Sequence, residues 1–257
     1  MNKACFVDGA KFRNEFIDLP VSSEEIMKKI SDFEVLVLRN VFDAKEMTAL
    51  KNRLAKYAEA NAPQNPPIAP GAPNFYRLDK NPEKSTLKRI SRAFSSFYWN
   101  ELDIAGERPY LKALARLRNR LVGLADDYAF YGVEDGHISS PTILQYPVGG
   151  GYLQSHVDPP SKQKVVVVAI LSERGVDYQS GGVYVEDPKG ENRVLVDELM
   201  GPGDVYLMNP AARHGVAPID PEKTLDFDSS AGRWMMFSTL VSHASLYGQK
   251  TEGLVAY

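Results

Sequence analysis

Residues 164–186 have the sequence KVVVVAILSERGVDYQSGGVYVE, in which two short apolar runs flank a segment rich in glycine, serine and aspartate. Branched residues fill the runs Lys164–Leu171 and Gly182–Glu186, a pattern typical of buried strands bounded by turns. Similar short runs occur on both sides; they are Thr142–Tyr146, Arg193–Val196, Asp204–Met208 and Arg233–Val241. Short strands separated by Gly, Pro and Asp turns predict a jelly roll or barrel over residues 136–245.

Residues 1–135 differ from this pattern, because apolar residues recur there at helical spacing. Ser22 or Ser23 precedes one such series and Asp43 another, as N-capping residues do. The run Glu34–Arg39 is an exception and predicts a strand. Two later series also have helical spacing; they are Leu87, Ile90 and Phe94, and then Leu111, Leu114, Leu117, Leu121 and Leu124. The sequence therefore predicts a mostly helical first half.

Between two of these helical series lies Asn61–Pro82, which is rich in proline and has no periodicity. A long irregular connection in a compact domain can be a lid over a site or a plain surface loop, and both alternatives remain open. The combined patterns predict a single α+β domain over residues 1–257. In this domain a mainly helical support with the lid, residues 1–135, packs against a jelly-roll core, residues 136–245.

The composition is that of a globular protein, with 44% hydrophobic residues, 25% charged residues and a formal net charge of −3. This balance provides no basic surface for nucleic acid or an anionic membrane, so we expect neither as a partner. Cys5 is the only cysteine, which fits a reducing compartment. The charged start of the chain lacks the apolar segment of a secretory signal, and the longest apolar run is too short to span a bilayer. We therefore expect a cytoplasmic protein.

Three residues have the chemistry of metal ligands. His156 and Asp158 lie two apart in a strand-like run that ends at Pro159. Residues two apart on a strand project from the same face, so an imidazole and a carboxylate can converge there. His214 follows a later apolar run. Two histidines and one carboxylate on one side of a metal leave the other side open, which suits ferrous iron and oxygen.

A His-x-Asp pair alone is a weak signal, since two polar residues on an exposed strand would look the same. The surrounding motifs add specificity. Between about Ile143 and Ser242 they are, in order, His156-Val-Asp158, Leu171-Ser-Glu173, Gly181-Gly-Val-Tyr184, Gly201-Pro-Gly-Asp204 and His214-Gly-Val216. This order resembles the iron(II)/2-oxoglutarate-dependent dioxygenase superfamily. The run Glu34-Val-Leu-Val-Leu-Arg-Asn-Val-Phe42 is similar to its phytanoyl-CoA hydroxylase-like branch, and the run Tyr146-Pro-Val-Gly-Gly-Gly-Tyr152 is similar to its prolyl hydroxylase-like branch. The resemblance implies a double-stranded β-helix, the cupin-like form of the jelly roll.

The resemblance also implies that His156, Asp158 and His214 bind Fe2+, with 2-oxoglutarate and O2 as co-substrates. The distal carboxylate of 2-oxoglutarate then needs a buried cation. Family members usually carry an arginine on the strand after the distal histidine, and Arg233 fits that strand, although its spacing from His214 is longer than is common. Lys164, on a neighbouring predicted strand, is the alternative.

Other residues are expected near the co-substrate. Tyr146 resembles the tyrosine that contacts the co-substrate in prolyl hydroxylases, displaced here by one residue. Tyr152 and Gln154 share strand parity with His156 and could line the pocket, or could be ordinary barrel residues. Beyond the metal ligands, we assign no catalytic residue.

The resemblance implies hydroxylation of an unactivated C–H bond, with release of succinate and CO2. Asp158 supports hydroxylation, because radical halogenases of the superfamily lack a carboxylate at that position. We expect a small-molecule substrate. Two alternatives remain open: a cupin-type metal dioxygenase or isomerase that does not use 2-oxoglutarate, and a non-enzymatic jelly-roll binding module.

Overall fold

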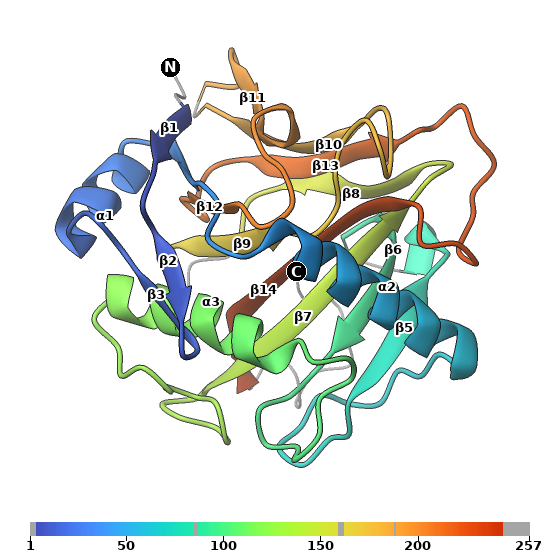
Figure 1. Ribbon diagram of the computed structural model, residues 1–257, viewed down its shortest axis with the longest axis horizontal. Helices are drawn as coiled ribbons and strands as arrows, with labels where there is room; N and C mark the ends of the chain where they lie inside the picture. Colours follow the sequence, from blue (N-terminus) through green and yellow to red (C-terminus); the bar gives the residue numbers. More distant parts are fainter. Residues whose placement is uncertain (1–3, 85–86, 159–161, 188, 244–257) are drawn as a thin grey trace.

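The computed structural model describes residues 4–84, 87–158, 162–187 and 189–243. Within these residues most strands belong to one curled twelve-stranded sheet (Figure 1). Its strands in chain order are β1 (Ala4–Val7), β4 (Val35–Leu38), β5 (Phe75–Asp79), β6 (Arg89–Ser95), β7 (His137–Pro147), β8 (Gly151–His156), β9 (Val166–Ile170), β10 (Gly182–Glu186), β11 (Arg193–Leu195), β12 (Val205–Met208), β13 (His214–Ile219) and β14 (Gly232–Ser242). The remaining strands, β2 (Lys11–Arg13) and β3 (Phe16–Asp18), form a separate hairpin.

The large sheet folds into two walls. One wall has the order β1-β4-β12-β9-β14-β7, and the other has the order β8-β13-β10-β11. Strand β6 joins them, because Arg92–Ser95 pair with β7 whereas Arg89 and Ile90 pair with β8. The antiparallel β7–β14 ladder runs unbroken from Gly232 opposite Pro147 to Ser242 opposite His137. This arrangement is consistent with the predicted jelly roll.

Alternating residues of the first wall face two different cores. Val168, Tyr206 and Met235 pack in the interior between the walls. Val167, Leu207 and Trp234, one residue away in each strand, pack in a second core outside that wall. The alternation follows from the period of two in a strand, and burial of both faces explains why these strands are almost wholly apolar.

Three α-helices, α1 (Ser23–Ser31), α2 (Ala44–Ala60) and α3 (Arg108–Leu121), supply the other side of the outer core. Helix α3 packs across β14, β9 and β7, and Figure 1 shows α2 in front of the same wall. The predicted N-caps are confirmed, since Ser22 accepts a hydrogen bond from the Glu25 N–H and Asp43 from the Glu46 N–H. No helix among the described residues is long and apolar enough to cross a membrane.

The prediction of a mostly helical first half is wrong. The described residues before 136 contain these three helices, the short 3-10 helix η1 (Pro82–Lys84) and six strands, β1 to β6. The series Leu87, Ile90 and Phe94 lies around and in β6, where Phe94 faces the outer core and Ala93 faces the interior. Pairing with β5, β7 and β8 stabilises the strand, and such tertiary pairing overrides a short helical spacing. The predicted lid is also partly a strand, because Phe75–Asp79 is β5.

The Gly201-Pro-Gly-Asp204 motif binds the segment between β4 and α2 to the jelly roll. The Asp204 carboxylate accepts hydrogen bonds from Arg39 Nη1 at 2.9 Å and from the Asn40 N–H at 2.8 Å. Gly203 has a φ of +91°, and a Cβ there would collide with the Phe42 carbonyl oxygen. This motif is therefore structural, and it joins the N-terminal elements to β12.

Candidate metal centre

The two histidines are brought together by strand pairing. Strands β8 and β13 are antiparallel, and His156 lies directly opposite His214 in their register. Directly opposite residues have neighbouring side chains on the same face. The two imidazole rings accordingly lie with centroids 4.2 Å apart and planes inclined by 52°. The pairing, and not the sequence separation, therefore creates the site.

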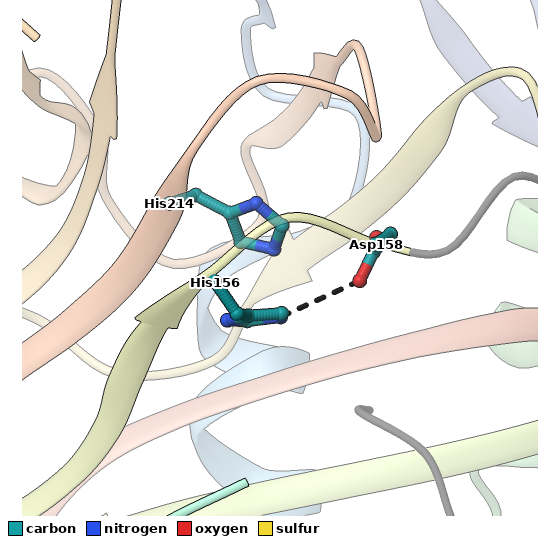
Figure 2. A group of neighbouring side chains, drawn as sticks. All are labelled: His156, Asp158 and His214. Atoms are coloured by element: carbon teal, nitrogen blue, oxygen red, sulfur yellow. Dashed lines mark ion pairs between the residues drawn. The ribbon is translucent and has the colours of Figure 1, made fainter. Parts of the chain in front are cut away.

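Asp158 joins them from the segment that leaves β8. Its backbone N–H donates to the Pro210 carbonyl at 3.1 Å, which holds this segment against the turn before β13. Its Oδ1 lies 3.4 Å from His156 Nε2 (Figure 2). One ligand atom from each of His156, Asp158 and His214 lies within 4.8 Å of the other two. The predicted triad thus converges on one point.

Backbone carbonyls orient both imidazoles. His156 Nδ1 lies 2.9 Å from the Gln154 carbonyl oxygen, and His214 Nδ1 lies 2.9 Å from the Ala212 carbonyl oxygen. A carbonyl oxygen only accepts hydrogen bonds, so each Nδ1 carries the proton. In the neutral imidazole this leaves the Nε2 lone pair free for a metal, the arrangement commonly seen around ligating histidines.

The site is sheltered on the histidine side and more open at the carboxylate. His214 is 7% exposed, and the side chains of His156 and Asp158 are 9% and 21% exposed. Burial lowers the pKa of His214 below its ordinary value, and His156 adds to this effect, although Asp158 opposes it. His214 is therefore neutral at pH 7, as a metal ligand must be. Two imidazole nitrogens and a carboxylate oxygen, open on one side, fit a divalent first-row metal such as iron(II).

The predicted cation, Arg233, is fully buried in the interior, whereas the alternative, Lys164, is exposed. Arg233 forms a bidentate ion pair with Asp197, with Nε–Oδ2 at 2.6 Å and Nη2–Oδ1 at 2.9 Å. Burial by itself would lower the pKa of Arg233, but the Asp197 carboxylate raises it above the ordinary value. The guanidinium therefore stays charged and is held in one orientation.

Tyr146 lies directly opposite Arg233 in the β7–β14 ladder and is also fully buried. Its hydroxyl has no hydrogen-bond partner among the described residues. Burial raises the pKa of Tyr146, so the hydroxyl stays protonated and can donate. A buried donor without an acceptor is costly in a folded protein and calls for an explanation such as a ligand. The carboxylate of 2-oxoglutarate would supply that acceptor beside Arg233.

Tyr206 of β12 lies beside Arg233, and no pattern in the sequence identified it. Burial raises the pKa of Tyr206 to about 12; Asp197 and Asp158 also raise it, and a hydrogen bond with Arg233 lowers it. Its phenol is therefore a neighbour of Arg233, and the charge of Asp158 in the triad also acts on it. Strand alternation in Asp204–Met208 could have placed Tyr206 on a shared face with Met208, but not beside Arg233.

A bulge interrupts β8 in the interval over which Tyr152 and Gln154 were expected to share a face with His156. Val216 pairs with Leu153 and His214 with His156, so β8 has one residue more than β13 over this interval. Beyond such a bulge, the residues of the strand that would have faced inward face outward, and the reverse. Leu153 packs in the interior, whereas Gln154 is exposed and its Oε1 accepts from the Lys88 N–H at 3.2 Å. Tyr152 is half-buried, and a pocket role for either residue stays a prediction without this support.

Two similar solved structures are both prolyl hydroxylases. The one from Trichoplax adhaerens, in complex with a peptide fragment of the oxygen degradation domain of hypoxia inducible factor, is 14% identical with a TM-score of 0.53, over 85% of this chain and 87% of that chain. The prolyl-4-hydroxylase of Pseudomonas putida is 15% identical with a TM-score of 0.52, over 84% of this chain and 97% of that chain.

No protein-family model matches the sequence, and no curated protein does. At these low identities the structural likeness establishes a shared fold. The resemblance found in the motifs is therefore confirmed at the level of the fold, and the chemistry has to be inferred from the site itself.

Proposed function

We propose that this protein is an iron(II)- and 2-oxoglutarate-dependent oxygenase that hydroxylates an unactivated C–H bond of a small molecule. In this proposal Nε2 of His156, Nε2 of His214 and a carboxylate oxygen of Asp158 hold the iron. The observation that carries the proposal is the convergence of these three ligand atoms within 4.8 Å. No other group of His, Cys, Asp and Glu residues with this geometry occurs in the described part of the chain.

The Arg233–Tyr146 pair supports 2-oxoglutarate as the co-substrate. Both residues are fully buried, and the Tyr146 hydroxyl, which has no partner within the described part of the chain, supplies a donor for an anionic oxygen next to a guanidinium. With 2-oxoglutarate bound, iron(II) would supply oxygen activation coupled to the release of succinate and CO2. The protein's own part is to hold both imidazoles by their Nδ1–H groups, to orient the distal carboxylate and to exclude water from the buried end.

The substrate class and the domain organisation belong to the same proposal. We infer that the chain works as a single domain, because β4 of the first half pairs with β12 of the jelly roll. A small-molecule substrate is the expectation from the sequence, and it remains part of this proposal. The Trichoplax protein is in complex with a peptide, so a substrate panel should contain short proline-containing peptides beside amino acids and acyl thioesters.

Iron binding and co-substrate turnover test the proposal together. Metal-free protein is loaded with iron(II) without oxygen, desalted and assayed for iron, and then supplied with 2-oxoglutarate and air while succinate is measured. We expect about one iron per chain and slow succinate formation even without substrate. The His214→Ala variant should lose both. The matched control His137→Ala removes a histidine outside the triad, whose Nδ1 forms a local hydrogen bond with the Asp135 carbonyl, and should retain both.

The results also separate the two alternative functions. Iron binding without any consumption of 2-oxoglutarate, and unaffected by Arg233→Met, would indicate a metal dioxygenase or isomerase of the cupin type. Failure of the wild-type protein to retain iron(II), manganese(II) or zinc(II) would indicate a binding module in which the histidines are incidental.

A further inference from the structure

Asp197 is a buried acid that contacts the proposed co-substrate site but has no role in the proposed reaction. It lies in the short 3-10 helix η2 (Val196–Glu198) that follows β11 and is 5% exposed. Its two oxygens take the Nε and Nη2 edge of Arg233. This edge offers two parallel N–H groups and is the one best suited to a carboxylate ligand. The protein has therefore filled it with a carboxylate of its own.

Asp197 is held in place independently of Arg233. Its Oδ2 also accepts a hydrogen bond from the Tyr178 hydroxyl at 2.8 Å and from the Val183 N–H at 3.1 Å. Gly182, with a φ of +118°, makes room for it, because a Cβ at that position would overlap the Asp197 carboxylate. These contacts come from the segment before β10 and from β10 itself, so Asp197 is a fixed partner and cannot swing away when a ligand enters.

The donors left on Arg233 are few. Of the five N–H groups of a guanidinium, two are used by Asp197, and Nη1 donates to the Met235 sulfur at 2.9 Å. Arg233 also forms a hydrogen bond with the Tyr206 phenol. A thioether is a weak acceptor, so a stronger one can replace it. The donors that Asp197 does not use lie on the side of the guanidinium away from it. A ligand carboxylate would therefore meet a guanidinium whose charge is already compensated.

We propose that Asp197 is a positioning residue that sets co-substrate specificity by compensating the charge of Arg233. The site then recognises the distal group of a 2-oxo acid mainly by hydrogen bonds from Arg233 and Tyr146. As a result it discriminates only weakly between a distal carboxylate and an isosteric uncharged acceptor such as a carboxamide. This inference rests on the proposed function, because it takes the 2-oxo acid as the ligand.

The test compares two unreactive analogues of 2-oxoglutarate, N-oxalylglycine and N-oxalylglycinamide, which differ only in the distal group. Their dissociation constants are measured by calorimetry on the full-length protein loaded with manganese(II). For the wild type we expect the carboxylate to bind less than about tenfold more tightly than the carboxamide, a difference of about 1.4 kcal/mol. For Asp197→Asn, which removes the charge but keeps the shape, we expect the ratio to rise by about tenfold.

Tyr178→Phe is the matched control, since it removes a neutral donor to the same carboxylate and leaves every charge in place. Its ratio should stay within about twofold of the wild-type value. A wild-type ratio above about a hundredfold overturns the inference without any variant, so the test holds even if Asp197→Asn does not fold. A folded Asp197→Asn variant with an unchanged ratio overturns it as well. If neither analogue binds the wild type, the proposed function itself has failed.

Discussion

Replacement of Tyr146 by phenylalanine tests whether the Tyr146 hydroxyl serves ligand binding or the stability of the fold. The Tyr146 hydroxyl is fully buried, lies opposite Arg233 in the β7–β14 ladder and has no partner among the described residues. A hydroxyl buried without a hydrogen bond costs about 1–3 kcal/mol. The phenylalanine variant removes that cost and keeps the ring in the interior core. Without ligand it should therefore be as stable as the wild type, or more stable by about 1 kcal/mol.

The same substitution should weaken co-substrate binding. A hydrogen bond to a charged group contributes about 1.5–3 kcal/mol, which corresponds to a roughly tenfold to hundredfold higher dissociation constant for 2-oxoglutarate. Urea unfolding of the metal-free protein measures the first effect. Calorimetric titration of the manganese(II) protein with N-oxalylglycine measures the second. Opposite signs for stability and affinity are the signature of a donor reserved for a ligand.

Tyr98→Phe is the control for burial alone. The Tyr98 hydroxyl is also buried, but it donates to the Leu111 carbonyl at 2.9 Å. Its loss should destabilise the protein by about 1 kcal/mol and leave co-substrate affinity unchanged. The reasoning is refuted if Tyr146→Phe loses stability as Tyr98→Phe does while still binding N-oxalylglycine with wild-type affinity.

Three further predictions concern the site and its support. Asp220 accepts hydrogen bonds from the Gln179 and Ser180 N–H groups and pairs with Lys223; burial opposes these contacts, yet they lower the pKa of Asp220. The resulting stability is present above the unfolded pKa of about 3.9 and is lost as pH falls through the lower folded pKa. Urea unfolding should therefore find Asp220→Asn less stable than the wild type by about 2 kcal/mol at pH 7, and the difference should shrink as the pH falls below about 3.9. In Gly182→Ala the added methyl group would clash with the Asp197 carboxylate. This variant should therefore have a lower midpoint of thermal unfolding and a lower affinity for N-oxalylglycine. Wild-type values for both would contradict the close contact. Removal of iron with a chelator should lower the unfolding midpoint of the wild type and leave that of His214→Ala unchanged, as scanning calorimetry can show.

Capping residues and short apolar runs correctly predicted the helix starts and strands that depend only on residues close together in the chain. The N-caps Ser22 and Asp43 and the apolar strands β9 and β12 occur where their residue types indicate. Strand β6 was predicted as a helix, because Leu87, Ile90 and Phe94 have helical spacing. Its pairing partners lie on three other strands, and no local pattern contains that information.

Inside the site, too, some features follow from the sequence and others only from long-range pairing between strands. The resemblance to the oxygenase superfamily implied Arg233, on the strand after His214, but Asp197, 36 residues earlier, has no motif that marks it as the partner of an arginine. The bulge that turns Gln154 outward arises from the register of β8 against β13. A shift of one residue in register exchanges the two faces of a strand, so parity counted along the chain failed over an interval of three residues.

The amino-acid sequence by itself determined the chemistry available to this protein: two imidazoles, one carboxylate and one strand-borne arginine, with apolar runs that have to be buried on both faces. Only the tertiary structure decided which of these groups meet, because His156 and His214 become neighbours through cross-strand register and Arg233 receives its counter-ion from the 3-10 helix η2, which is distant in the chain. Donor type is a property of single residues and can be found by inspection. Convergence depends on long-range pairing between strands, whose energy is shared among many residues and is not encoded at any one position.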